Sequence, residues 1–198
     1  MISVRSFFRM GQISRAMLGS LMLIVLLLTG CYKDRARQPS ILILAVENYG
    51  PDTALCSWES NPQVQSALDP FCREATEVKL AQSVHRDSVP ALAALLFGSS
   101  PQELKVETNE QSVPAAFESY AEKFHQNDQQ TAFFASSPLF MRRTGLAQGF
   151  DLFDETHKVE ARRWGRRHEE VLSNFFRWKA DLGSTSSYAV LTFSDLNF

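Results

Sequence analysis

The sequence predicts an α/β domain with a mainly parallel β-sheet flanked by helices. Residues 41–46 form a continuous aliphatic run, which is typical of a strand buried on both faces. Strand-like and helix-like segments then alternate along the chain, and proline, glycine and asparagine residues lie between them. This alternation predicts βαβ units and therefore parallel strands.

The spacing of apolar residues separates the expected helices from the expected strands. A proline near its start and Gly98 just past its end bound the helix over 90–97. The inner stripe of the longest helix includes Trp164, Val171, Leu172, Phe175 and Trp178. In chain order we expect a helix over 64–75, a strand over 78–83, helices over 90–97 and 113–126, a strand over 131–135, a helix over 160–182 and a strand over 188–193.

Residues 1–30 have the pattern of an export signal. Arg5, Arg9 and Arg15 lie in a stretch without acidic residues, an apolar run covers 16–28, and small residues precede Cys31. A helix over that apolar run is about 20 Å long and the bilayer core is about 30 Å thick. We therefore expect a cleaved secretory signal in preference to a permanent membrane span.

Leu28-Thr29-Gly30-Cys31 resembles the bacterial lipobox, in which the cysteine is acylated and becomes the new N-terminus. The resemblance implies an exported lipoprotein in the cell membrane or outer membrane, facing the periplasm or the exterior and held by the acyl chains on Cys31. The alternatives are an ordinary signal peptide that leaves a free thiol, or an uncleaved anchor. Residues 31–40 are polar and charged and form a tether, and 41–198 form one domain.

The charge and the cysteine content limit which partners and which covalent bonds are expected for the mature chain. Cleavage removes three arginines and no acidic residue, which makes the formal charge of −2 more negative. A mildly acidic chain gives no case for nucleic-acid binding. Cys56 and Cys72 remain in an oxidising compartment, where we expect a disulfide, with two unpaired buried thiols as the alternative. No spacing of cysteine and histidine indicates a zinc site.

The strand order directs attention to the carboxyl ends of the strands, because ligands of parallel sheets bind there. Glu47 and Asn48 directly follow the first strand and offer the oxygen ligands that Ca²⁺ and Mg²⁺ prefer. Ser88 lies near the start of a helix, where backbone N–H groups and the helix dipole favour negative charge. These residues are the candidate site, with Asp52 and His85 as weaker candidates.

Short motifs recur in a fixed order along residues 41–198. They are the aliphatic strand with Glu47-Asn48, Leu68-Asp69, Ser88-Val89-Pro90-Ala91-Leu92, Gly98 with Pro101, Thr131-Ala132-Phe133-Phe134, and Gly149-Phe150-Asp151. In this order and spacing they resemble the N-terminal portion of the sulfatase branch of the alkaline phosphatase superfamily.

The resemblance implies hydrolysis or transfer of sulfuric or phosphoric esters, and therefore an anionic ester substrate. It places Ser88 at the nucleophile and Glu47 and Asn48 at ligands of a divalent cation, Ca²⁺ or Mg²⁺. Such chemistry needs an in-line nucleophile and positive charge on the equatorial oxygens of the ester.

The sequence departs from the family pattern at the site. Ala91 and Leu92 stand where the family has a serine and an arginine, so conversion of Ser88 to formylglycine is not expected. Glu47-Asn48 replaces an Asp-Asp pair and removes one negative charge. The family's remaining metal ligands lie in its C-terminal half, and the chain ends at Phe198. We therefore expect a truncated domain, inactive alone. The alternative is a non-catalytic surface lipoprotein that uses the α/β scaffold for binding.

Simpler structural roles also account for these residues. Ser88 could be a helix N-cap, and Glu47 a solvated turn residue. The arginines of 162–167 are flanked by glutamates, which predicts a salt-bridged helix face and not a site for an anionic partner. The four histidines are expected to be structural or to face solvent.

Overall fold

The computed structural model describes residues 38–47, 72–76, 78, 80–156 and 165–194. The chain divides into two compact units, 1–38 and 39–198. The predicted signal, the predicted lipidation site Cys31, and Asn48, Asp52, Cys56 and the Leu68-Asp69 pair lie outside the described residues. Within the described ranges, no helix has the length and the apolar character needed to cross a bilayer.

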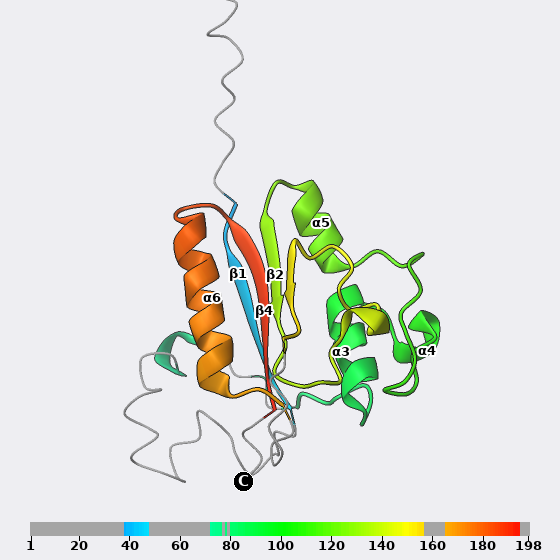
Figure 1. The fold of residues 1–198 in the computed structure, drawn as a ribbon. Coiled ribbons are helices and arrows are strands. Elements are labelled where there is room, and N and C mark those ends of the chain that lie inside the picture. Colours follow the sequence, from blue (N-terminus) through cyan, green and yellow to red (C-terminus); the bar gives the residue numbers. More distant parts are fainter. Residues whose placement is uncertain (1–37, 48–71, 77, 79, 157–164, 195–198) are drawn as a thin grey trace, which may run out of the picture. The chain divides into compact units, whose positions relative to one another are not determined.

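A parallel sheet forms the centre of the second unit (Figure 1). All neighbouring strands are parallel, which confirms the predicted mainly parallel α/β fold. The strands are arranged in the order β1-β4-β2-β3. Their bounds are β1 (Ile41–Val46), β2 (Gln130–Phe134), β3 (Leu152–Asp154) and β4 (Ser187–Phe193).

Helices cover both faces of this sheet (Figure 1). On one face, α6 (His168–Leu182) places Val171 and Phe175 against Ala132, Phe134 and Leu191 of the sheet. The other face of the same strands is covered by α5 (Tyr120–Gln126) and α3 (Ser88–Phe97), whose buried side chains share one core cluster with the sheet residues that point to this side. This alternation follows from the two-residue period of a strand. α4 (Pro101–Leu104) packs against α3.

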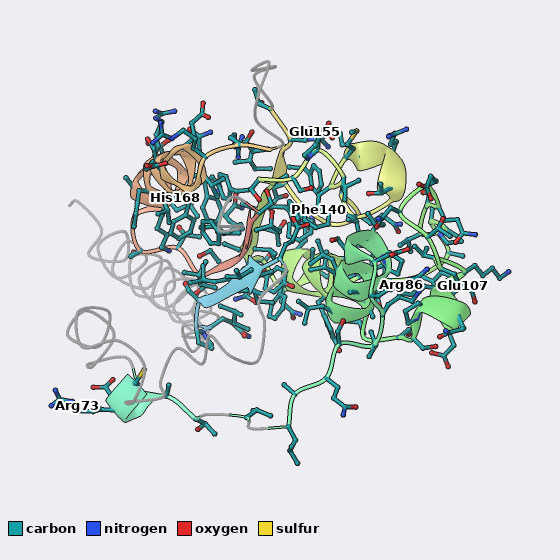
Figure 2. All side chains as sticks on the ribbon, turned by 90° about the horizontal axis from the view of Figure 1, so that it is seen from below. Arg73, Arg86, Glu107, Phe140, Glu155 and His168 are labelled. Carbon is teal, nitrogen blue, oxygen red and sulfur yellow. The ribbon has the colours of Figure 1, made fainter. Side chains whose placement is uncertain are left out.

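Aromatic side chains fill the core beneath α3 and α5. Phe133 of β2 is fully buried, and its ring contacts those of Phe140, Phe150 and Phe153 at centroid distances of 6.3, 5.5 and 4.7 Å. Figure 2 shows Phe140 among the side chains of this interior, whereas the Arg86 side chain is 93% exposed. The core therefore depends on segments from β2, β3 and the loop between them.

Two of the expected helices are shorter than predicted. The helix expected over 113–126 begins only at Tyr120, because Ser119 and Glu122 form a reciprocal capping box that starts it there. Val113 is buried but belongs to a loop, where its N–H donates to the carbonyl of Thr144 at 3.0 Å. Its place in the apolar stripe reflects loop burial and not a helical face.

The helix expected over 160–182 begins at His168. Gly165 has φ +97 and lies so close to Ser136 and Ser194 that a side chain would not fit. The inner stripe is confirmed for Val171 and Phe175, which are buried, and for Leu172 and Trp178, which pack against them. Trp164 lies outside the described part of the chain.

The strands near the N-terminus also differ from expectation. Residues 78 and 80–83 form no strand, and Val78 and Leu80 are exposed. β1 forms as predicted but is not buried on both faces, since Leu44 is 58% exposed. Among the described strands β1 lies at the sheet edge and pairs with β4 alone, so its outer positions have no neighbouring strand to pack on. Of the helix expected over 64–75, residues 72–75 are described; 72–74 are helical and residue 75 is a bend.

Candidate functional site

Glu47 and Ser88 meet at the carboxyl edge of the sheet. Glu47 is the first residue after β1, and its N–H donates to the carbonyl of Phe193 at 2.9 Å, next to the end of β4. The Ser88 hydroxyl Oγ donates to Glu47 Oε2 at 3.0 Å. A carboxylate and a hydroxyl 41 residues apart in the chain thus form one pair, at the edge where parallel sheets bind ligands.

Ser88 is the first residue of α3 and not its N-cap. The N-cap position belongs to Asp87, whose backbone is extended at φ −83 and ψ 142 and whose side chain makes no capping bond. The structural alternative of Ser88 as an N-cap is therefore wrong, because its hydroxyl faces Glu47 and not the helix N–H groups. The helix follows as predicted, with Gly98 at φ +66 ending it.

Burial raises the pKa of the Glu47 carboxyl above its ordinary value of 4.5, and the hydrogen bond from Ser88 opposes this effect. Its second oxygen, Oε1, is buried and has no hydrogen-bond partner among the described residues. A buried carboxylate with one unpaired oxygen is a strong proton acceptor. It also has a free ligand position, so the alternative of a solvated turn residue does not describe Glu47.

Replacing Glu47 by glutamine should stabilise the domain at neutral pH. The folded-state pKa is raised, so ionisation of Glu47 destabilises the folded chain as pH rises through that pKa. We expect Glu47→Gln to raise the melting temperature by a few degrees at about pH 8 in chelator-treated buffer. The difference should disappear at about pH 3, well below the ordinary pKa of 4.5, where the carboxyl is neutral in both states. A lower melting temperature at pH 8 would show that the ionised carboxylate is well satisfied.

The chemistry of Glu47 fits a divalent cation. Its unpaired Oε1 is the kind of hard oxygen ligand that Ca²⁺ and Mg²⁺ take. No cluster of three or more potential metal-binding side chains occurs among the described residues, so further ligands have to come from elsewhere. Asn48, the second predicted ligand, is one residue away but outside the described ranges.

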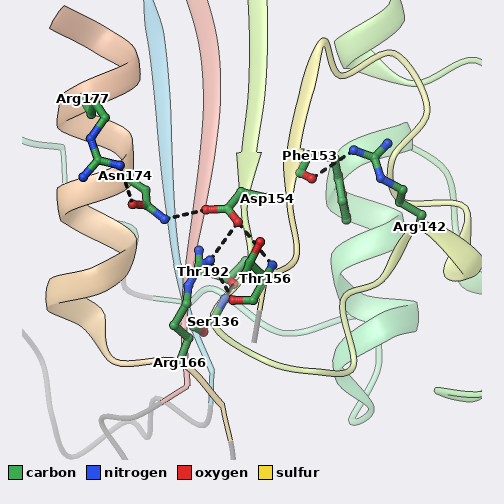
Figure 3. A network of polar contacts seen from close by, with 9 residues as sticks. All are labelled: Ser136, Arg142, Phe153, Asp154, Thr156, Arg166, Asn174, Arg177 and Thr192. Atoms are coloured by element: carbon green, nitrogen blue, oxygen red, sulfur yellow. Dashed lines mark hydrogen bonds and ion pairs between the residues drawn. The ribbon is translucent and has the colours of Figure 1, made fainter. Parts of the chain in front are cut away.

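A second polar cluster at the carboxyl edge was not predicted (Figure 3). The Arg166 side chain is 2% exposed, and its Nη1 donates to Asp154 Oδ1 at 2.9 Å and to the Thr156 carbonyl at 3.1 Å. Asn174 of α6 donates to the other oxygen of Asp154 at 2.9 Å. The cluster joins the end of β3 to the segment before α6 and to α6 itself.

Against the effect of burial, hydrogen bonds and the charge of Arg166 lower the pKa of the Asp154 carboxyl. Burial alone would raise the pKa of its carboxyl, but the hydrogen bonds from Arg166, Asn174 and the Thr156 N–H, with the positive charge of Arg166, lower it below 3.8. The predicted salt-bridged helix face is wrong for Arg166, which is buried and precedes the helix. Arg167, at the N-cap of α6, does pair at the surface with Glu169 at 2.9 Å. Arg162 and Arg163 lie outside the described residues.

Hydroxyl groups connect this cluster to the strand ends. The Ser136 N–H, just after β2, donates to Thr192 Oγ1 at 2.9 Å, and Ser136 Oγ donates to Ser194 Oγ at 3.1 Å. The Arg166 N–H donates to the Ser136 carbonyl at 2.6 Å. The ends of β2, β3 and β4 are thereby held together, and the Glu47 N–H contacts the last residue of β4 beside them.

The positions that depart from the sulfatase pattern have structural roles here. Leu92 is 6% exposed and belongs to the core beneath α3. An apolar core residue thus occupies the place where the family has an arginine. Leu92 therefore contributes no positive charge to an anion bound at Ser88.

The contacts of the remaining predicted residues that the structure describes do not include Ser88. His85 Nδ1 accepts a hydrogen bond from the Asp87 N–H at 3.0 Å, a structural contact in the turn before α3. His125 pairs with Asp151 at 2.8 Å, next to the start of β2 and so at the opposite edge of the sheet. Cys72 is disulfide-bonded, but its partner lies outside the described residues, so pairing with Cys56 stays a prediction.

The strand order and the comparison with solved structures show a sulfatase-like α/β fold. Comparison with solved structures finds BT4656 in complex with its substrate D-glucosamine-2-N,6-O-disulfate, at a TM-score of 0.64 and 15% sequence identity. The match covers 82% of this chain and 35% of that one, so this chain spans about a third of the length of BT4656. At this identity the similarity concerns the fold alone. No family model matches the chain, and no curated protein matches it.

Proposed function

We propose that this chain carries the nucleophile-bearing portion of a sulfatase-like hydrolase or transferase that acts on sulfuric or phosphoric esters. The observation that carries the proposal is the hydrogen bond from Ser88 to Glu47 at the carboxyl edge of the sheet. Support also comes from the fold shared with BT4656, a protein solved with a sulfated sugar as its substrate.

The proposed reaction uses Ser88 and Glu47 in separate roles. Ser88 Oγ forms a bond to the phosphorus or sulfur atom, and the bond from that atom to the ester oxygen breaks. The hydroxyl proton passes to Glu47 Oε2, which already accepts the hydrogen bond. The leaving alcohol takes a proton from water, and water or an acceptor hydroxyl then removes the group from Ser88.

Glu47, with Asn48 beside it, would also hold a divalent cation. When bound, such an ion supplies positive charge to the ester oxygens. The unpaired Glu47 Oε1 supports this assignment. Ser88 reacts as an unmodified hydroxyl. The serine and arginine that accompany formylglycine formation in the sulfatase family are replaced here by Ala91 and Leu92.

Covalent labelling tests the nucleophile without a complete catalytic site. In a reaction with an alkyl fluorophosphonate, Ser88 Oγ bonds to phosphorus and fluoride leaves. We expect intact-mass and peptide analysis of the full chain to show one adduct, on Ser88, and Ser88→Ala to abolish it. Absence of the adduct from the folded wild-type chain would reject Ser88 as the nucleophile.

Ser100 offers a matched internal control. Its hydroxyl also donates to a carboxylate at 3.0 Å, that of Glu103, but this pair is an exposed capping box. Hydrogen bonding to Ser100 lowers the pKa of Glu103, whereas burial raises that of Glu47. Glu47 is therefore the stronger proton acceptor, and we expect labelling of Ser88 to exceed that of Ser100 by at least tenfold, a factor typical of a positioned base.

We expect the chain alone to turn over aryl phosphate or aryl sulfate at little more than the background rate. Its described residues bring a hydroxyl and a carboxylate together but contain no cluster of three potential metal ligands. Steady hydrolysis by the purified chain, lost in Ser88→Ala, would contradict this expectation.

A non-catalytic binding role is the second candidate, and the burial of Leu92 at the family's arginine position favours it. The two candidates differ in their response to cations. The first predicts that millimolar Ca²⁺ or Mg²⁺ raises the melting temperature of the wild-type chain but not of Glu47→Gln. An equal response in both chains would favour the binding role.

Export and lipid anchoring through Cys31 belong to the same proposal and are supported by the lipobox-like sequence. Expression in a bacterial host should give a membrane-fraction protein whose mass includes acyl chains. Cys31→Ser should remove both the added mass and the membrane association. A soluble, unacylated wild-type chain would reject the anchor.

A further inference from the structure

The amino end of α3 is capped by a residue from a different segment. Asp87 holds the N-cap position without a side-chain capping bond, and its carboxylate lies 3.8 Å from Arg86. The Val89 N–H, in the first turn, instead donates to Asn109 Oδ1 at 2.9 Å. Asn109 thus performs from 20 residues away the role that an N-cap side chain usually performs.

This arrangement leaves the Ser88 hydroxyl available. Serine at a helix start commonly bonds the N–H groups of the first turn. Here the Val89 N–H donates to Asn109, Pro90 has no N–H, and the Ala91 N–H donates to the Asp87 carbonyl at 3.2 Å. The Ser88 hydroxyl is therefore not drawn back onto the helix, and it donates to Glu47 instead.

The segment that carries Asn109 is itself fixed. The Glu107 and Thr108 N–H groups both donate to Gln111 Oε1, and the Gln111 N–H returns a bond to the Thr108 carbonyl at 3.3 Å. Val106 and Val113 on either side are 0% and 3% exposed. A local turn anchored in the core at both ends thus holds the Asn109 amide in place.

We propose that Asn109 is a positioning residue for Ser88. By capping α3 in place of the local side chains, it holds the helix start in the orientation in which Ser88 donates to Glu47. The effect of Asn109 on reactivity rests on the proposed function of Ser88. The effect of Asn109 on the Val89 N–H and on the Ser88 side-chain orientation can be measured separately.

Nuclear magnetic resonance on the full, isotope-labelled chain can test the inference. The first quantity is the hydrogen-exchange rate of the Val89 amide, and the second is the Ser88 χ1 rotamer population from three-bond couplings. The variants are Asn109→Ala, the conservative Asn109→Asp, and Glu110→Ala as an exposed neighbouring control. Asn109→Gln, which moves the amide oxygen by one methylene, serves as a second disruptive change if alanine lowers the folded fraction too far.

In Asn109→Ala we expect Val89 exchange to accelerate roughly fivefold, the factor that corresponds to a lost cap, and Ser88 to populate more than one rotamer. Asn109→Asp should restore both values, and Glu110→Ala should change neither. If Ser88 keeps its single wild-type rotamer while Val89 exchange accelerates, Asn109 is only a structural cap and the inference is overturned. An unchanged Val89 rate overturns it as well.

The outcome is separable from that of the proposed function. Failure of fluorophosphonate to label Ser88 in the wild-type chain rejects the nucleophile but leaves the rotamer result unaffected. A loss of the Ser88 rotamer preference in Asn109→Ala, with labelling reduced by a similar factor, supports both.

Discussion

Replacing Asp154 by alanine is expected to lower the free energy of unfolding by about 3–5 kcal/mol, a loss typical of breaking a buried ion pair. Asp154 is the charge partner of Arg166, whose side chain is 2% exposed. The Nε and Nη2 atoms of Arg166 already have no hydrogen-bond partner among the described residues. Removing the carboxylate would leave the buried guanidinium without an ion-pair partner among the described residues.

Urea unfolding followed by circular dichroism measures this loss. Glu169→Ala is the matched control, because it removes the carboxylate from the exposed pair with Arg167 and should leave the stability close to that of the wild-type chain. The double change Asp154→Leu with Arg166→Met should lose less than Asp154→Ala alone, since it removes both charges. A loss below about 1 kcal/mol for Asp154→Ala would show that the Arg166 charge is solvated.

The same pair should make stability depend on pH at the acid end. The pKa of Asp154 is lowered in the folded chain, so its contribution is complete above about pH 4, the range of an unfolded aspartate. It should decline as pH falls toward the folded-state pKa. The stability difference between the wild-type chain and Asp154→Ala is therefore expected to shrink below about pH 4.

Phe133→Ala is expected to cost about 3–5 kcal/mol, the range for truncating a buried aromatic side chain. The Phe133 ring is 0% exposed and stacks on Phe153 at 4.7 Å. It also makes edge contacts with Phe140 and Phe150. Truncation opens a cavity lined by rings from the loop between β2 and β3 and from β3 itself.

Phe176→Ala provides the control for this change, because Phe176 is 63% exposed on α6. Its free energy of unfolding should change by less than about 1 kcal/mol. Phe133→Leu, which keeps part of the volume, should fall between the two. If Phe133→Ala and Phe176→Ala were equally mild, the aromatic cluster would not be the centre of the core.

The sequence predicted the parts of the fold that local patterns determine. Helices cover both faces of β2 and β4, so the residues of these strands are buried on both sides. Such strands are continuous apolar runs, which the sequence shows directly. The helix start at Tyr120 was missed, although Ser119 and Glu122 are a readable capping box. The apolar residues keep a helical spacing from Val113 onward, which predicts an earlier start. A buried loop residue has the same apolar character as a residue on the inner face of a helix.

The candidate site was predictable only in part. Glu47 and Ser88 could be placed at the carboxyl edge from the order of strands and helices, and the structure brings them into contact. Arg166 could not be recognised as buried, because its partner Asp154 comes from a strand of three residues that has no distinct sequence pattern. The capping role of Asn109 on α3 depends on a tertiary contact, which no local pattern indicates. For α6, the glycine at position 165 within the arginine cluster is the sequence feature that indicates a helix start after residue 165.

The central claim is that the Glu47 carboxylate activates the Ser88 hydroxyl within one site. The most direct measurement is the rate of Ser88 labelling by fluorophosphonate as a function of pH, in the wild-type chain and in Glu47→Gln. The wild-type rate should rise as Glu47 ionises, at a pH above the ordinary value of 4.5 because burial raises its pKa, and then level off. The Glu47→Gln rate should be at least tenfold lower over the same range and show no such step. Equal rates and identical profiles for the two chains would contradict the account.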